Sequence, residues 1–156
     1  MSTELKALTD EYRQDYYNFC KKGAEYPYLF SEDTFDWLWQ KVKDPDERHF
    51  IIFEDGEKAG FCEAHFIGDD AADIGVEIEE QYRRRGIGKR AAELMMEHGD
   101  IKSLDRIYWK TFANNEGSVK LAEALGGQID HVERLELSGH VEGEVTELDI
   151  LVYRLR

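Results

Sequence analysis

The sequence predicts an α/β (α+β) domain with a mixed, mostly antiparallel central sheet of about six to seven strands, flanked by about four helices. Apolar side chains recur at three- and four-residue spacing in some segments and alternate in others. These segments follow the order helix, helix, three strands, helix, strand, helix, two strands. Short turns make consecutive strands antiparallel, whereas strand–helix–strand connections usually join parallel strands. The length of 156 residues fits a single domain that spans residues 1–156.

Two helices are expected near the N-terminus. The first begins at a cap formed by Thr9 or Asp10 and runs to about Lys22, because its aromatic residues then share one face. The second begins at Asp33 and stops at Pro45, since the residue before a proline disfavours helical backbone.

The remaining elements alternate in type along the chain. We expect strands at 49–53, 59–67 and 73–79, a helix at 86–99, a strand at 106–112, a helix at 116–125, and strands at 129–137 and 145–155. The Asp55-Gly56 pair predicts a tight hairpin turn between the first two strands. A turn that contains Gly139 and Gly143 joins the last two strands.

Composition excludes several classes of function. The formal charge is −14, from 34 acids and 20 bases, which argues against binding nucleic acid or anionic membranes through the whole surface. The first residues do not resemble a signal peptide, and no apolar run approaches the ~20 residues that span a bilayer. We therefore expect a cytoplasmic protein in which Cys20 and Cys62 are reduced thiols. The five histidines lack metal-ligand spacing, so no metal is expected.

The most informative segment joins an alternating strand to a helix through a short basic turn. Gly86 and Gly88 allow the backbone to approach a ligand closely, and the unpaired N–H groups at a helix start attract anions. The bases gathered here are Arg83, Arg84, Arg85, Lys89 and Arg90. Cations oppose the dipole at a helix N-terminus, so helix stability does not account for them. The segment predicts a cradle for a diphosphate group, with a solvated run of charges as the alternative.

A dinucleotide site is a competing interpretation of this segment. The spacing Gly86-x-Gly88-x-x-Ala91 fits the dinucleotide pattern, which is weak by itself. Dinucleotide folds place their glycines directly after the first strand of a parallel sheet. Here the glycines follow three strands expected to be antiparallel. A nucleotide-dependent oxidoreductase is therefore disfavoured.

Two motifs resemble those of the GNAT superfamily of acetyl-CoA-dependent N-acetyltransferases. The signature [Q/R]-x-x-G-x-[G/A] is matched from Arg83 to Gly88. A second element, Asn-x-x-Ser followed by an apolar helix that ends in Leu-Gly, is matched from Asn115 to Gly126. The Asn-x-x-Ser form resembles the branch of ribosomal-protein N-terminal acetyltransferases. The resemblance covers nearly the whole chain and implies transfer of an acetyl group from acetyl-CoA to a primary amine by direct attack in a ternary complex.

The resemblance also implies which residues hold acetyl-CoA as co-substrate. The strand before the basic turn would bind the pantetheine arm through its backbone, in a slot beside the strand at 106–112. The basic turn would bind the diphosphate, and the Asn-x-x-Ser element would lie near the pantetheine end. The residues expected to bind the coenzyme are Val76, Glu77, Ile78, Arg83, Arg84, Arg85, Gly86, Ile87, Gly88, Lys89, Asn115 and Ser118.

The expected catalytic residues are Glu77, Glu63 and Ser118. Many members of the family have a tyrosine acid in the helix after the asparagine, where this chain has Ala122. Ser118 is the candidate substitute, and the alternative is that it only caps or packs its helix. Glu77 is the first choice for the base that deprotonates the amine and Glu63 the second. The alternative for each of the two is a solvated strand residue.

The acceptor is expected to be a protein N-terminus or a small cationic amine, such as a polyamine or an aminoglycoside-like compound, because an acidic chain attracts cations. In the family, the region of the aromatic segment 26–30 forms one wall of the acceptor site. Tyr26 and Tyr28 are therefore expected to bind the acceptor. Trp37 and Trp39 are expected to pack their helix against the sheet.

A different class of function stays open beside the enzyme. The chain could be a non-catalytic acyl-CoA-binding or regulatory module that kept the coenzyme slot and lost its acid. Members of the family are often dimers, which makes the C-terminal hairpin a candidate interface for a homodimer.

Overall fold

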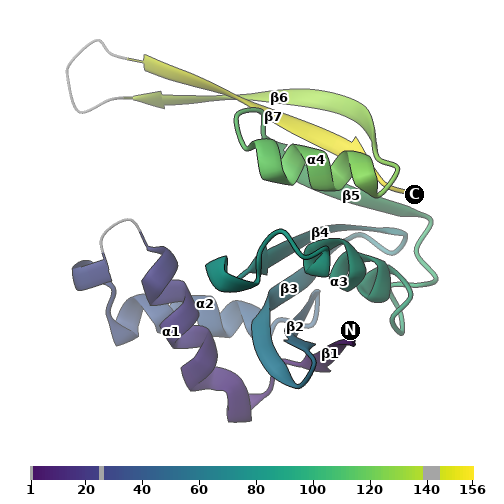
Figure 1. The fold of residues 1–156 in the computed structure, drawn as a ribbon. Coiled ribbons are helices and arrows are strands. Elements are labelled where there is room, and N and C mark those ends of the chain that lie inside the picture. The colour runs from purple at the N-terminus through teal and green to yellow at the C-terminus, as the bar shows by residue number, and fades with distance from the viewer. Residues whose placement is uncertain (1, 25–26, 139–144) are drawn as a thin grey trace.

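One mixed sheet of seven strands organises the chain (Figure 1). The computed structural model describes residues 2–24, 27–138 and 145–156. Its strands are β1 (Thr3–Ala7), β2 (Glu47–Glu54), β3 (Glu57–Ile67), β4 (Ala71–Ile78), β5 (Arg106–Phe112), β6 (Gln128–Ser138) and β7 (Val145–Arg154). Its α-helices are α1 (Arg13–Gly23), α2 (Glu32–Val42), α3 (Ile87–Met96) and α4 (Glu116–Ala124). Short 3₁₀ helices are η1 (Asp10–Tyr12), η2 (Pro27–Leu29) and η3 (Glu80–Tyr82).

The strand order confirms the mixed sheet that the sequence predicts. The order is β1-β2-β3-β4-β5-β7-β6, and only the β4–β5 pair is parallel among the pairs that the described residues form. Helix α3 forms the crossover between these two parallel strands. The predicted turn between β2 and β3 is present, with Asp55 and Gly56 at φ of 50° and 84°. Two successive residues in the left-handed region are typical of the turn that an Asp-Gly pair favours.

Alternation along the strands divides the core between the two faces of the sheet. Cys62, Ala64 and Ile74 belong to the cluster that α3 and α4 cover. Ile51 and Phe61 point to the opposite face, where α1 and α2 cover them. Below, these are called the α3 face and the α1 face. The two faces of the sheet are therefore covered by different helices and carry different side chains.

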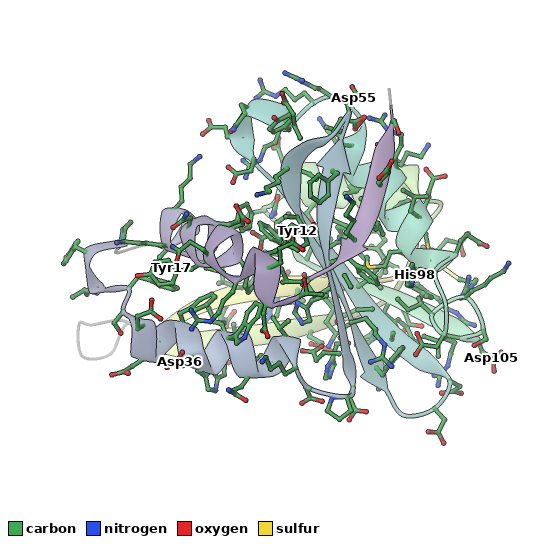
Figure 2. The ribbon with its side chains drawn as sticks, turned by 90° about the horizontal axis from the view of Figure 1, so that it is seen from below. Tyr12, Tyr17, Asp36, Asp55, His98 and Asp105 are labelled. Carbon is green, nitrogen blue, oxygen red and sulfur yellow. The ribbon has the colours of Figure 1, made fainter. Side chains whose placement is uncertain are left out.

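Aromatic contacts attach the two N-terminal helices to the α1 face. Tyr17 lies between α1 and α2, whereas Asp36 lies on the outer side of α2 (Figure 2). The rings of Tyr17 and Phe35 meet edge to face with centroids 5.1 Å apart. The ring of Tyr16 meets that of Phe61, on β3, at 5.1 Å. Such pairs contribute about 0.5–1.5 kcal/mol each beyond the area that they bury.

Three details of the N-terminal half differ from the sequence prediction. The edge strand β1 was not predicted, because it is short and charged residues separate its apolar ones. The first helix starts as the 3₁₀ turn η1 before α1, and Thr9 makes no side-chain capping bond. Trp39 is buried as expected, but Trp37 is 61% exposed, so its expected packing is wrong. Phe35 and Trp39 lie four residues apart and point to the core, which turns Trp37 to the outer face.

The C-terminal half agrees with the predicted order of elements apart from one helix end. Helix α3 ends at Met96, three residues before the predicted end. The predicted turn at Gly139 and Gly143 falls outside the described residues. Among the residues with coordinates described, no helix has the length and apolar character needed to cross a membrane.

Candidate active site

The sheet opens between β4 and β5. Only Ala71–Asp73 pair with β5, opposite Arg106–Tyr108, and the two strands separate beyond that point. An open groove of about 1010 Å³ lies along the separation. It is lined by Glu63, Gly75, Val76, Glu77, Ile78, Tyr82, Arg83, Arg84, Gly86, Ile87, Gly88, Lys89, Trp109, Lys110, Thr111, Phe112, Asn115, Gly117, Ser118, Lys120 and Leu121. The groove therefore brings together most of the residues that the sequence assigns to coenzyme binding.

The groove presents residues from both faces of the sheet. Along β4, Val76 and Ile78 pack toward the α3 face, and Glu77 between them points to the α1 face. Along β5, Trp109 belongs to the core of the α3 face, so the neighbouring Lys110 points the other way. One elongated ligand and a second, separate molecule can thus meet between the strands from opposite faces.

The end of the groove at α3 is built to receive an anion. Gly86 takes the N-cap position in left-handed backbone, at φ 76°, and as a glycine it offers no side-chain capping bond to the first turn of α3. The N–H groups of that turn carry the positive end of the helix dipole. A Cβ at Gly88 would lie 3.3 Å from a methyl carbon of Leu121, so glycine also lets α3 approach α4 closely. The side chains of Arg83, Arg84, Lys89 and Lys120 line the same region.

Two of the five bases in the predicted cradle point elsewhere. Arg85 does not line the groove, and its guanidinium lies over the ring of Tyr82 at 5.5 Å. Arg90 also lies away from the groove, and its guanidinium donates to Glu54 at 2.9 Å and to Thr3 at 2.8 Å. The coenzyme-binding role predicted for the Arg85 side chain therefore has no support from its position.

Glu63 is the carboxyl group at the other end of the groove. It is half-buried on β3 and points to the α1 face, because its neighbours Cys62 and Ala64 point to the α3 face. Gly75 lies opposite it on β4, and a Cβ there would come within 2.7 Å of Glu63 Oε1. Burial raises the pKa of Glu63 from near 4.5 to about 7, and the carboxylate of Glu77 acts in the same direction. Glu63 can therefore both accept and release a proton near neutral pH.

Further acidic residues share the α1 face with Glu63. Glu47 and Asp73 also raise the pKa of Glu63 through their negative charges. Burial raises the pKa of Asp73 as well. Tyr16 and Cys20 lie above them on α1, and burial raises the pKa of both side chains, to about 11 for Cys20. Both groups are neutral at physiological pH, so neither compensates the carboxylates.

Ser118 faces the groove with its hydroxyl oriented by a tryptophan. The indole Nε1–H of Trp109 donates to Ser118 Oγ at 3.0 Å. Because the indole nitrogen can only donate, the hydroxyl proton of Ser118 stays available to another acceptor. Asn115 caps α4 through its Oδ1, which accepts from the backbone N–H of Ser118 at 3.2 Å. Ala122, at the position of the usual tyrosine, is buried in the core of the α3 face.

A model of the acetyltransferase (GNAT) family matches residues 5–127, which is most of the chain. The chain belongs to the GNAT family.

Three relatives show how this GNAT chain is similar to known proteins. Spermidine N(1)-acetyltransferase of Escherichia coli K12 is 29% identical over 109 residues, which is 68% of this chain and 59% of that protein. The crystal structure of an acetyltransferase that modifies the N-terminal serine of ribosomal protein L7/L12, from Salmonella typhimurium, has TM-score 0.73 and 17% identity over 97% of this chain and 94% of that one. The N-acetyltransferase PseH of Campylobacter jejuni, in complex with acetyl coenzyme A, has TM-score 0.68 and 15% identity over 99% of both chains.

These comparisons confirm the predicted fold, including its likeness to ribosomal-protein acetyltransferases. The chain spans about 59% of the length of the spermidine acetyltransferase that it matches. The substrate of that enzyme therefore does not establish the substrate of this chain. The two structural neighbours are below 25% identity and support the fold alone.

Only one of the two predicted acceptor residues can be placed relative to the groove. Tyr28 lies on η2, is 80% exposed and does not line the groove. Tyr26 falls outside the described residues. Sequence reasoning did not single out Trp109 and Gly75, because their partners lie on other elements of the fold. Ser118 on α4 accepts from Trp109, and Glu63 on β3 lies opposite Gly75. In the described part of the chain, no group of His, Cys, Asp and Glu is arranged to hold a metal ion.

The raised pKa of Glu63 predicts how folding stability changes with pH. The folded chain holds this proton more tightly than the unfolded chain, so the contribution of Glu63 to folding stability should fall as pH rises from about 4.5 to about 7. A Glu63→Gln variant lacks this loss. Its stability relative to wild type should increase by about 3 kcal/mol between pH 4 and pH 8, measured by denaturant unfolding. The exposed Glu80→Gln serves as control, and a Glu63→Gln curve parallel to wild type would contradict the prediction.

Proposed function

We propose that the chain transfers an acetyl group from acetyl-CoA to a primary amine of a small, cationic molecule, with polyamines as the first candidates. The observation that carries the proposal is the groove between β4 and β5, which has bases at its α3 end and carboxylates on the α1 face. An anionic coenzyme and a cationic acceptor would enter from opposite faces. They would meet where the strands have separated.

The α3 end suits the coenzyme. The uncapped first turn of α3 and the bases Arg83, Arg84 and Lys89 fit a diphosphate group. Beyond Asp73, the edge of β4 that faces the groove has no paired strand within the described residues. The amide groups of a pantetheine arm can hydrogen-bond to such an edge as an added strand would.

The α1 face suits a cationic acceptor. Glu47, Glu63, Asp73 and Glu77 bring four carboxylates to this face, close enough for three of them to raise the pKa of Glu63. Lys110 and His65 act on Asp73 in the opposite direction, so the carboxylates outnumber the bases but are partly compensated. The formal charge of −14 adds a long-range attraction for cations. The similarity to spermidine N(1)-acetyltransferase agrees with this chemistry. A protein N-terminus, as in the ribosomal-protein acetyltransferases, carries less positive charge and is the weaker candidate.

Glu63 is better placed than Glu77 to act as the base. Glu77 is exposed, whereas Glu63 is half-buried with a pKa of about 7. A bound ammonium group would give its proton to Glu63, directly or through water, and the neutral nitrogen would attack the thioester carbonyl carbon. The C–N bond forms and the C–S bond breaks, and the nitrogen releases its second proton to water, which leaves the neutral amide and a thiolate.

Ser118 is the candidate acid for the departing thiolate. Trp109 donates to its oxygen, which leaves the hydroxyl proton free to move to the sulfur. Water then restores that proton. A thiol has a pKa of about 8.5, so its thiolate is a stable leaving group. Ser118 as the acid should therefore contribute less to the rate than Glu63 as the base.

A panel of acceptors tests the proposed function. Spermidine, putrescine, an aminoglycoside and a neutral peptide with a free N-terminus are compared by release of the coenzyme thiol at low and high salt. The polyamines should exceed the peptide in kcat/KM by about tenfold or more at low salt, and the ratio should shrink as salt screens the carboxylates. Tight acetyl-CoA binding with no turnover would instead support a non-catalytic module, and a preference for the neutral peptide would exclude a cationic acceptor.

The two carboxylates on the groove should differ sharply in kinetics. Glu63→Gln should lower kcat by about 10²–10⁴-fold, because it removes the proton acceptor. In wild type, kcat/KM should rise with pH through an apparent pKa near 7, since only ionised Glu63 accepts a proton. Glu77→Gln should keep most of kcat and move that limb to lower pH, because one repelling charge is gone. Loss of kcat in Glu77→Gln alone would restore Glu77 as the base.

Removal of the Ser118 hydroxyl tests the acid. Ser118→Ala should lower kcat by about tenfold to a hundredfold and leave the Kd for CoA almost unchanged. The hydroxyl-bearing Ser118→Thr serves as the matched control and should recover part of the loss. Unchanged kcat in Ser118→Ala would leave this residue a packing role only.

Two expectations from the sequence stay predictions. They are the acceptor contacts of Tyr26 and Tyr28, and a homodimer formed through the C-terminal hairpin.

A further inference from the structure

All three guanidinium nitrogens of Arg90 donate to other parts of the chain, although the side chain is 34% exposed. It lies one turn into α3 and points away from the groove. Its Nε donates to Thr3 Oγ1 at 2.8 Å and its Nη2 donates to Glu54 Oε2 at 2.9 Å. Its Nη1 donates to the backbone carbonyl of Arg85 at 3.2 Å. All three nitrogens are thus committed, and none is directed at a ligand in the groove.

One of the partners of Arg90 is a buried carboxylate. Glu54 is 5% exposed, and Thr3 Oγ1 donates to the same carboxylate oxygen, Glu54 Oε2, at 2.8 Å. The other oxygen, Oε1, has no hydrogen-bond partner among the described residues. A buried carboxylate with one free oxygen requires a compensating charge, so the position of the Arg90 guanidinium is firmly set. Thr3 on β1 and Glu54 on β2 thereby fix the Arg90 guanidinium beside the basic turn of residues 83–86.

That fixed cation determines which way one peptide group of the turn faces. The carbonyl and the N–H of a trans peptide point in opposite directions. Because Arg90 holds the carbonyl of Arg85, the N–H of Gly86 is directed away from Arg90. Gly86 lines the groove, and a Cβ on it would lie 3.1 Å from Arg90 Nη1. Arg90 therefore lies behind Gly86, and the groove lies on the other side.

The turn needs such a tether because its backbone is unfavourable without one. Arg84 has φ of 65°, in the left-handed region that a residue with a long side chain rarely adopts. Gly86 follows at φ 76°. Like charges on neighbouring arginines also repel one another in the absence of an anion.

We propose that Arg90 is a positioning residue that pre-orients the Gly86 N–H for the diphosphate of the coenzyme, with Glu54 and Thr3 as its anchors. The inference rests on the proposed use of acetyl-CoA, and it adds a role for a residue that does not touch the ligand. It also predicts that substitution of Arg90 affects only donors that carry the diphosphate group. A thioester donor that lacks the diphosphate would not need the oriented turn.

The test compares Arg90→Lys with wild type. Lysine keeps the positive charge beside Glu54 but cannot reach three partners at once. The Kd for CoA, measured by calorimetry, should rise about tenfold, as expected when one hydrogen bond to a charged group is misaligned. The kcat/KM with acetyl-CoA should fall by a similar factor, whereas kcat/KM with S-acetylpantetheine should stay within about twofold of wild type.

Arg48→Lys is the matched control. Arg48 also donates to backbone carbonyls, those of Pro45 and Glu47, and pairs with the Asp100 carboxylate at 2.8 Å, but it does not line the groove. This variant should bind CoA as wild type does. If Arg90→Lys does not fold, the double variant Glu54→Gln, Arg90→Gln replaces it, because it removes both charges together and leaves none buried alone.

The outcomes are distinct. Wild-type affinity for CoA in Arg90→Lys would overturn the inference and leave the proposed function intact. Equal losses with acetyl-CoA and S-acetylpantetheine would also overturn it, since Arg90 would then support only the fold. Failure of the wild-type chain to bind CoA would overturn both proposals.

Discussion

The early end of the β4–β5 ladder is the constraint on which the rest of the structure depends. Two parallel strands that share only three residue pairs leave the centre of a sheet open, with backbone groups that require partners. The remaining strands, β5, β7 and β6, stay attached through antiparallel pairs, so the opening does not divide the fold. Everything proposed for function follows from this one opening. A groove between strands, unlike a groove on a surface, receives ligands from both faces of the sheet.

Close backbone contacts hold the opening in shape. Gly60 lies so near β4 that a Cβ there would overlap the carbonyl oxygen of Glu77, and Gly75 leaves space for the Glu63 carboxylate. After α4, Gly127 lies against the carbonyl oxygen of Ala122, where a Cβ would come within 2.8 Å. A side chain at Gly60 or Gly127 would displace backbone, and one at Gly75 would displace the Glu63 carboxylate that lines the groove. Glycine is therefore required at these positions because neighbouring atoms leave no room for a Cβ, and not because the backbone needs to be flexible.

The sequence predicted the order of elements and the basic turn because those signals are local. Periodicity identifies α3, and an Asp-Gly pair identifies the turn after β2. It did not predict β1, whose pairing with β2 is a contact between distant segments. It also counted Arg85 and Arg90 with the bases that face the ligand, since charge in a sequence carries no direction. Only the positions of Glu54 and Thr3 assign Arg90 to the interior.

The choice between Glu63 and Glu77 illustrates the same limit and leads one step further. Both alternate correctly on their strands, so the sequence could not rank them, and it favoured Glu77. Their surroundings differ, because Glu63 is half-buried and Glu77 is exposed beside it. Burial is the largest cause of the raised pKa of Glu63, and the negative charge of Glu77 is the second largest. A cationic acceptor that enters this cluster would offset that repulsion and favour the ionised form of Glu63. The proposed base would then become ionised when an ammonium group is present to give it a proton, and an empty site would hold the proton near neutral pH.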